Sequence, residues 1–168
     1  LLYIIAAHRH QQGLLVGGIA GTLMTNLALE HAFKTASINF SRAKVGDRYV
    51  HEMLVENGWQ LGGENSGHIL CLDKHTSGDG IIAALQVLAA LKAQKQTLTT
   101  VGKALTLYPQ VLINVPVKQR IDMNANPAIQ ASVKAAEQAL NGSGRILLRA
   151  SGTELKLRVM VEGQNGEL

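Results

Sequence analysis

The sequence predicts an α/β protein in two parts: a mainly parallel α/β sheet domain followed by a small α+β domain of β-α-β-β order. In the first part, short apolar runs alternate with helical patterns, which is typical of a parallel sheet covered by helices. After Leu107-Tyr108-Pro109 the order changes to strand, helix, strand, strand. The chain has 17 glycines and 3 prolines, a balance that favours tight turns between elements over disorder.

The strands of the first part are expected where apolar runs end in turn residues. The first run, Leu14–Ile19, is closed by Gly21 and Thr22, and Thr22 is a suitable N-cap for a following helix that contains Ala32. Further strands are expected at Ile38–Ala43, Trp59–Gly62 and Ile69–Leu72.

Two helices of this part have clearer signals. One is expected to begin near Asp47 and to end at Asn57-Gly58, where glycine favours a left-handed cap. The other is expected over Gly80–Lys95. Its larger apolar residues recur at helical spacing and predict one buried stripe of Ile81, Leu85, Leu88 and Leu91.

The second part is expected to contain a strand at Val111–Val117, a helix after Pro127, and two strands at Arg145–Leu148 and Leu157–Val161. We therefore place the domain boundaries at 1–9, interpreted as the tail of an upstream domain, 10–108 and 109–168. The opening run Leu1–Ala7 indicates an element whose partners lie upstream.

Composition narrows the class of function. The net charge of +4 is spread over both parts, without the basic block of a nucleic-acid-binding arm, and no apolar run is long enough to cross a membrane. The single cysteine, Cys71, lies in an apolar run, which indicates a buried thiol and a cytoplasmic protein. The six histidines show no spacing that requires a metal.

The most informative segment is the polar loop between Trp59–Leu61 and Ile69–Leu72. It contains Glu64, Asn65, Ser66 and His68, flanked by glycines. This density of hydrogen-bonding groups suits recognition of sugar hydroxyl or amino groups. The alternative is a hairpin turn with incidental polar residues, although Glu and His do not favour turns.

A second polar loop begins at Arg149 and contains Ser151, Gly152 and Thr153. Hydroxyl groups, successive backbone N–H groups and one arginine are suited to a phosphate, although an ordinary solvated turn is the competing interpretation. Lys44, which follows a predicted strand, is at a position where ligand-binding groups gather in α/β sheets. A sugar-binding loop and a phosphate-binding loop on one chain indicate a phosphosugar ligand.

These motifs resemble the C-terminal part of the bacterial phosphoglucosamine mutases, a branch of the α-D-phosphohexomutase superfamily. The likeness covers nearly all of the chain. Its anchors are Gly21–Met24, Ala43–Val50, Gly63–His68, Ser77–Gly80 and Leu148–Gly163.

The resemblance implies four domains around one cleft, of which this chain matches the third, which reads the sugar, and the fourth, which holds the phosphate. It implies that Glu64, Asn65, Ser66, His68 and Lys44 contact the sugar. It further implies a phosphate site of Arg149, Ser151, Gly152 and Thr153.

The resemblance also implies that the phosphoserine and the magnesium-binding aspartates belong to N-terminal domains that are missing from this sequence. The chain would then bind a hexosamine phosphate and perform no catalysis by itself. The relatives usually have Lys and Pro where this chain has Ala150 and Leu155, which predicts a weaker phosphate loop.

Two other functions remain open from the sequence. One is a phosphomannomutase/phosphoglucomutase of the same superfamily; Asn65 is the residue that distinguishes the phosphoglucosamine branch from these relatives. The other is a non-catalytic module that binds phosphosugars. Interaction with nucleic acid or a membrane is not expected.

Overall fold

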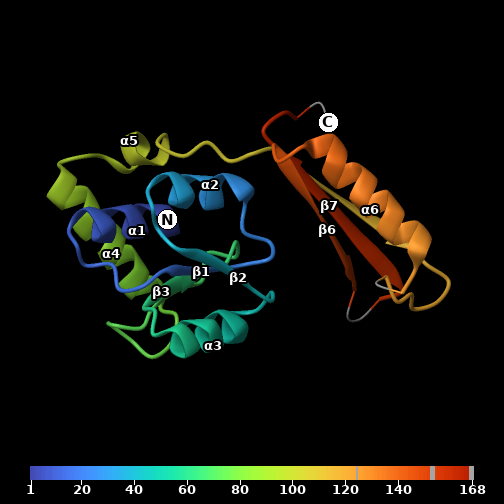
Figure 1. Cartoon of the computed structure of the whole chain (residues 1–168). Helices are drawn as coiled ribbons and strands as arrows, with labels where there is room; N and C mark the ends of the chain where they lie inside the picture. Colours follow the sequence, from blue (N-terminus) through green and yellow to red (C-terminus); the bar gives the residue numbers. More distant parts are fainter. Residues whose placement is uncertain (124, 152–153, 167–168) are drawn as a thin grey trace. The chain divides into compact units, whose positions relative to one another are not determined.

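The computed structural model describes residues 1–168 except 124, 152–153 and 167–168. The chain divides into two compact units, Leu1–Thr106 and Leu107–Leu168 (Figure 1). The first holds a mainly parallel sheet with helices and the second a small antiparallel sheet with one described helix, which confirms the predicted fold class.

The sheet of the first unit positions the loops that matter for function. Its strands are β1 (Ile19–Thr22), β2 (Phe40–Ala43), β3 (Leu61–Gly63) and β4 (Ile69–Cys71), in the order β2-β1-β3-β4. Strand β1 runs parallel to both β2 and β3, whereas β4 is antiparallel to β3. The carboxyl ends of β1, β2 and β3 therefore lie along one edge of the sheet.

Helices cover both faces of this sheet. The helices are α1 (Leu2–Gln11), α2 (Leu27–Thr35), α3 (Asp47–Asn57), α4 (Gly80–Gln94) and the short α5 (Leu98–Gly102). On one face, Val50 and Leu54 of α3 pack in a cluster with Ala20 of β1. On the other face, a larger core includes Ile5 of α1 and Phe33 of α2, together with residues of α4 (Figure 1).

Helix α3 lies very close to the sheet at Gly62. A Cβ atom on Gly62 would lie 2.8 Å from the Ala20 carbonyl oxygen and 2.8 Å from a methyl carbon of Val50. Any side chain at this position would push the helix away, so the glycine determines how closely α3 approaches β1 and β3. Helix α3 has the predicted bounds, and Gly58 caps it in the left-handed conformation.

The first strand and the start of α2 differ from the sequence prediction. Leu14 is 64% exposed, and the strand forms at Ile19–Thr22. The N-cap of α2 is Asn26, whose side chain accepts a hydrogen bond from Ala28 N, and not Thr22. Thr22 pairs with Ala43 within the sheet, so its hydroxyl serves the turn that follows and not the helix.

The predicted stripe of α4 is wrong for three of its four residues, whereas the fourth, Leu91, packs against the core. Ile81, Leu85 and Leu88 are 75%, 56% and 59% exposed, while the core side of the helix is formed by Ala83, Val87 and Ala90. Helix α4 is apolar on all sides, so periodicity alone does not select its buried face. Small residues on the core side let the helix lie close to its neighbours.

The N-terminal residues form helix α1, whose buried apolar residues belong to the core of the first unit. Arg9 of α1 is 6% exposed, and its guanidinium donates to Asp73 Oδ1 and to Gln86 Oε1, both at 2.9 Å. This network joins α1 to the segment after β4 and to α4. Cys71 is buried nearby as expected, and burial raises the pKa of its thiol, which keeps the thiol protonated and unreactive.

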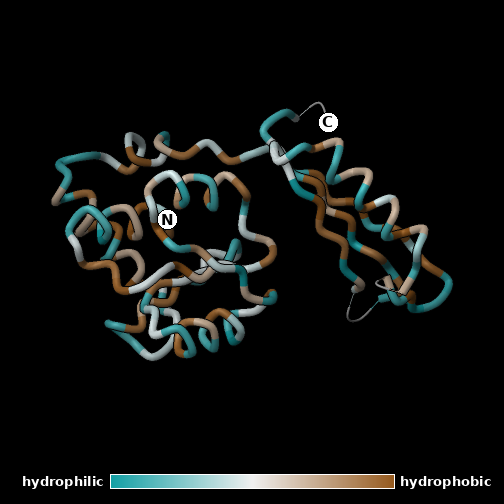
Figure 2. The backbone as a smooth tube through the Cα atoms, viewed as in Figure 1, coloured by the Kyte–Doolittle hydropathy of each residue, from teal (hydrophilic) through white to brown (hydrophobic). Residues whose placement is uncertain are grey.

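The second unit has the expected β-α-β-β order. Strands β5 (Gln110–Pro116), β6 (Gly144–Ala150) and β7 (Lys156–Gly163) form an antiparallel sheet in the order β5-β7-β6, and helix α6 spans Pro127–Leu140. Asn126 caps α6 and Pro127 occupies its first turn. The strands of this unit contain hydrophobic stretches (Figure 2), which supply the apolar face that a sheet covered by a helix requires.

Candidate functional site

The candidate sugar site lies at the carboxyl edge of the first sheet, where three loops meet. These are the loop from β1 to α2, the loop from β2 to α3, and the hairpin between β3 and β4. Polar groups collect at such an edge because each parallel strand ends there before the chain turns back. All the residues expected to contact the sugar are on the second and third of these loops.

The β3–β4 hairpin holds four of the expected residues in a tight turn. Glu64 N donates to His68 O at 3.0 Å and Gly67 N to Glu64 O at 3.1 Å. Gly67 adopts a φ of 90°, which a residue with a side chain rarely adopts. The Ser66 hydroxyl accepts weakly from His68 N at 3.4 Å, and Asn65 and Ser66 are both exposed. The turn thus presents its side chains to solvent beside the sheet edge.

Two hydrogen bonds fix this hairpin to the neighbouring loops. Glu64 Oε1 accepts from the backbone N–H of Gly46 at 2.9 Å, which ties the hairpin to the start of α3. Asn65 Nδ2 donates to the carbonyl oxygen of Met24 at 2.6 Å, which ties it to the loop after β1. Both side chains therefore position the site, in addition to any contact that they make with a ligand.

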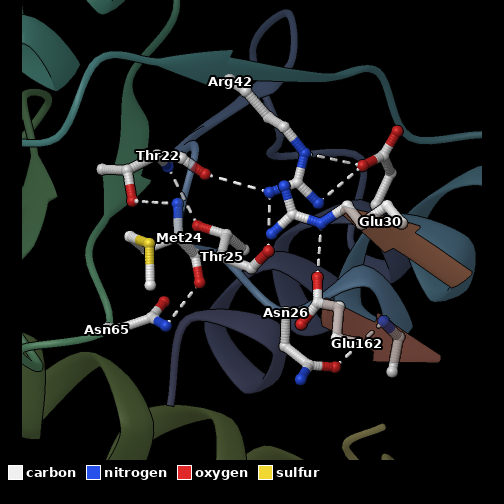
Figure 3. A network of polar contacts seen from close by, with 10 residues as sticks. Thr22, Met24, Thr25, Asn26, Glu30, Arg42, Asn65 and Glu162 are labelled. Carbon is white, nitrogen blue, oxygen red and sulfur yellow. Dashed lines mark hydrogen bonds and ion pairs between the residues drawn. The ribbon is translucent and has the colours of Figure 1, made fainter. Parts of the chain in front are cut away.

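Arg42 supports the loop that receives Asn65, and sequence reasoning missed this role. Its guanidinium lies between the Glu30 carboxylate, at 2.8 Å from Nε, and the carbonyl oxygens of Thr22 and Thr25, at 3.0 and 2.6 Å from Nη1 (Figure 3). The charged fork fixes the course of the chain from β1 into α2. No local signal reveals it, because the partners lie 12 to 20 residues away.

His68 is held in a narrow space at the same edge. Its Nε2 atom lies 3.7 Å from Asp47 Oδ2 at the start of α3. The ring also lies directly against Gly78, because a Cβ atom on this glycine would be only 2.1 Å from Nε2. The side chain remains 38% exposed, so the ring can still reach a ligand.

Lys44 lies on the loop between β2 and α3, as expected, and is exposed. Its ammonium group is 5.6 Å from the centre of the Tyr49 ring, a cation–π contact that holds the flexible chain near the helix. The structure thus brings Glu64, Asn65, Ser66 and His68 together on one hairpin, with Lys44 on an adjacent loop.

The expected phosphate loop lies in the second unit, between β6 and β7. Ser151 is buried, its N–H donates to Lys156 O at 2.9 Å, and its hydroxyl accepts from Glu154 N at 3.3 Å. Gly152 and Thr153, the other two expected binders, lie outside the described residues. Arg149 is on β6 immediately before the loop.

The charges on one face of this sheet are unusual. Arg149 is directly opposite Arg158 in the β6–β7 register, and like charges in such a pair destabilise a sheet. The next charged pair along the strands, Arg145 with Glu162, is complementary and forms an ion pair. The Nε atom of Arg149 is buried without a hydrogen-bond partner among the described residues. An anion at this face would satisfy both arginines.

Within the described parts of the chain, no group of three His, Cys, Asp or Glu residues is arranged to hold a metal ion. Among the described residues, no helix is sufficiently long and apolar to cross a membrane.

Two family models match nearly the whole chain. Residues 1–108 match the family model described as phosphoglucomutase/phosphomannomutase, alpha/beta/alpha domain III, and residues 112–168 match that of the phosphoglucomutase/phosphomannomutase C-terminal domain. The phosphoglucosamine mutase of Methylobacillus flagellatus is 70% identical over 168 residues, and that of Nitrosospira multiformis is 58% identical over 167. The matched segments cover 100% and 99% of this chain but only 37% and 36% of those relatives.

Solved structures show the same fold at low sequence identity. The Aspergillus fumigatus N-acetylphosphoglucosamine mutase, in complex with GlcNAc-6P and magnesium, superposes with a TM-score of 0.80 at 20% identity, over 99% of this chain and 43% of that one. A phosphoglucomutase/phosphomannomutase family protein from Burkholderia thailandensis has a TM-score of 0.68 at 17% identity, over 99% and 37%. This chain belongs to the phosphoglucomutase/phosphomannomutase family, in which it corresponds to domain III and the C-terminal domain.

Proposed function

We propose that this chain is the substrate-binding part of a phosphoglucosamine mutase that interconverts glucosamine 6-phosphate and glucosamine 1-phosphate. The relatives of highest identity described above are phosphoglucosamine mutases, and the match to them covers the whole chain. The chain spans little more than a third of their length. Its proposed partners are the hexosamine phosphate and the remaining domains of the longer protein.

One observation supports this proposal most strongly. The hairpin that carries Glu64, Ser66 and His68 is fixed at the carboxyl edge of a parallel sheet by hydrogen bonds to two neighbouring loops. A turn with incidental polar residues has no need of such bracing. A binding loop does, because its donors and acceptors must stay in place to select a ligand.

Each unit supplies binding groups for one part of the substrate. In the first unit, Ser66 and His68 supply hydrogen-bonding groups to the sugar, and Lys44 supplies a positive charge nearby. In the second unit, Arg149 and Ser151 hold the phosphate, together with Gly152 and Thr153. Arg158 adds a second positive charge opposite Arg149. Binding the sugar and the phosphate through separate groups fixes the orientation of the substrate relative to a phosphoryl donor.

The proposed reaction consists of two phosphoryl transfers. A phosphoserine on another domain gives its phosphate to glucosamine 6-phosphate, and the bisphosphate then turns round and returns the other phosphate to the serine. The groups of this chain bind and orient each of these species in line with the serine. The described residues offer no ligand set for magnesium, so we assign no magnesium ligand and no metal-dependent step to this chain. Alone, the chain is expected to bind substrate without turnover.

A chimera tests the proposal directly. The matching segment of the Methylobacillus flagellatus enzyme is replaced by this chain, and the interconversion of the two glucosamine phosphates is measured beside the unmodified enzyme. The proposal predicts turnover within about tenfold of the parent. A chimera that unfolds cooperatively but does not convert glucosamine phosphates would contradict it.

The same chimera separates the two alternatives. Preference for mannose or glucose phosphates would assign the chain to a phosphomannomutase/phosphoglucomutase. A folded chimera that binds sugar phosphates but transfers no phosphate from the serine of the parent would indicate a non-catalytic binding module.

A further inference from the structure

A cavity of about 250 Å³, lined mostly by polar and charged residues, adjoins the candidate sugar site in the first unit. Its walls come from the start of α3, from His68 of the hairpin, and from Ser77 and Gly78 before α4. Because His68 forms part of its wall, a sugar held by the hairpin would place one of its substituents at or near this cavity. Two acidic residues of α3 line the cavity; Glu52 is paired with Arg48, and the carboxylate of the other is therefore the group placed to contact that substituent.

That group is Asp47, the first residue of α3. Its Oδ1 atom accepts from the N–H of Arg48 at 2.8 Å, which fixes the carboxylate, while Oδ2 faces His68 Nε2 at 3.7 Å. The side chain of Asp47 is 64% exposed and so is accessible to a ligand.

The nearby charges leave this carboxylate available. The guanidinium of Arg48 forms its ion pair with Glu52, at 2.7 Å, and not with Asp47. Glu64 has one oxygen occupied by the N–H of Gly46. In the sequence, Asn65 distinguishes the phosphoglucosamine branch. In the structure, its amide nitrogen donates to the carbonyl oxygen of Met24. Asn65 therefore braces the loops, and the negative charge beside His68 comes from Asp47.

We propose that Asp47 is the residue that distinguishes hexosamine phosphates from hexose phosphates, by pairing its carboxylate with the cationic amine of the sugar; this inference rests on the proposed function. Glucosamine and glucose differ at one substituent, an ammonium group against a hydroxyl group. Either group can donate a hydrogen bond to the carboxylate, but only the ammonium group also pairs a positive charge with it. An acetylated amine has no charge and forms no such ion pair.

Titration of the 168-residue chain with three ligands tests the inference. Backbone amide shifts are followed during addition of glucosamine 6-phosphate, glucose 6-phosphate and N-acetylglucosamine 6-phosphate. The added ion pair predicts that glucosamine 6-phosphate binds about tenfold more tightly than glucose 6-phosphate. N-acetylglucosamine 6-phosphate should bind no better than glucose 6-phosphate.

The substitution Asp47→Asn should reduce the preference for glucosamine 6-phosphate to about onefold and leave the affinity for glucose 6-phosphate unchanged. Asparagine keeps an oxygen that accepts from Arg48 N, so α3 should stay intact, and thermal unfolding checks this. The matched control is Glu56→Gln, which removes the same charge from an exposed position of α3 that does not line the cavity. It should keep the tenfold preference.

The outcomes separate this inference from the function on which it rests. Equal affinity of the native chain for glucosamine and glucose 6-phosphates, or a preference that survives Asp47→Asn, would overturn the role of Asp47 alone. If none of the three sugar phosphates shifts the amide signals of the hairpin, the proposed sugar site itself is wrong.

Discussion

The position of His68 depends on the absence of a side chain at residue 78. A Cβ atom at Gly78 would lie 2.1 Å from His68 Nε2 and 2.4 Å from Cε1. Ordinary contacts between such atoms are about 3.5 Å or longer, so the substitution Gly78→Ala must move the ring by more than about 1 Å. The atoms in the way belong to the end of a side chain, and the backbone itself can stay in place.

The consequence for stability should be small and the consequence for binding larger. His68 is 38% exposed, so the ring can turn into solvent without straining the core. We expect the free energy of unfolding to fall by about 1 kcal/mol or less, the low end of the cost of overpacking. A displaced imidazole loses one hydrogen bond to the sugar, about 1.4 kcal/mol, which corresponds to about tenfold weaker binding of glucosamine 6-phosphate.

Urea unfolding and an NMR titration with glucosamine 6-phosphate measure the two quantities, and the His68 ring resonances report the displacement. The matched control is Gly80→Ala, because a Cβ there meets no atom within 4 Å and Gly80 begins α4. It should not weaken binding. Unchanged ring resonances together with unchanged affinity in the Gly78 variant would refute the argument that the glycine positions His68.

Three further substitutions test other parts of the structure. Arg42→Ala should lower the free energy of unfolding by about 2–3 kcal/mol, because Glu30 and two backbone carbonyls lose a charged donor, and a loss below about 0.5 kcal/mol in urea unfolding would contradict this. Burial raises the pKa of Asp73, but the hydrogen bonds and charges of Arg9 and Lys74 outweigh it and hold that pKa below its usual value. The ionised carboxylate therefore stabilises the fold above its unfolded pKa, and this stability is lost as the pH falls through the folded pKa. Urea unfolding of Asp73→Asn should consequently show a smaller loss of unfolding free energy below about pH 4 than that of the native chain. An equal loss in the two proteins would contradict this. Arg149→Ala should weaken calorimetric binding of inorganic phosphate and of sugar phosphates alike, by about 10- to 100-fold, and unchanged phosphate affinity would place the anion elsewhere.

Local chemistry made several elements predictable from the sequence. Helix α3 has an acidic first residue and a glycine cap at Gly58, so both of its ends could be read directly. The start of helix α6 could also be predicted, because Pro127 suits the first turn of a helix. The polar hairpin stood out because two of its residues, Glu64 and His68, do not favour a turn, and the structure places it at the edge of a parallel sheet.

Other features depend on contacts that no local pattern records. The orientation of α4 could not be predicted because the helix is apolar on all sides, and close packing selects its small residues for the core. Arg42 acts on partners 12 to 20 residues away, so its role becomes visible only when β1 and β2 pair. The bracing role of Asn65 likewise requires Met24, 41 residues earlier in the chain, to be its neighbour in space.

The most direct test of the central claim, that one chain reads both the sugar and the phosphate, is an NMR titration with glucosamine 6-phosphate, mannose 6-phosphate and inorganic phosphate. We expect shifts at Glu64 to His68 and at Arg149 and Ser151 with glucosamine 6-phosphate, and at Arg149 and Ser151 alone with inorganic phosphate. Shifts confined to Arg149 and Ser151 and alike for all three ligands would contradict it.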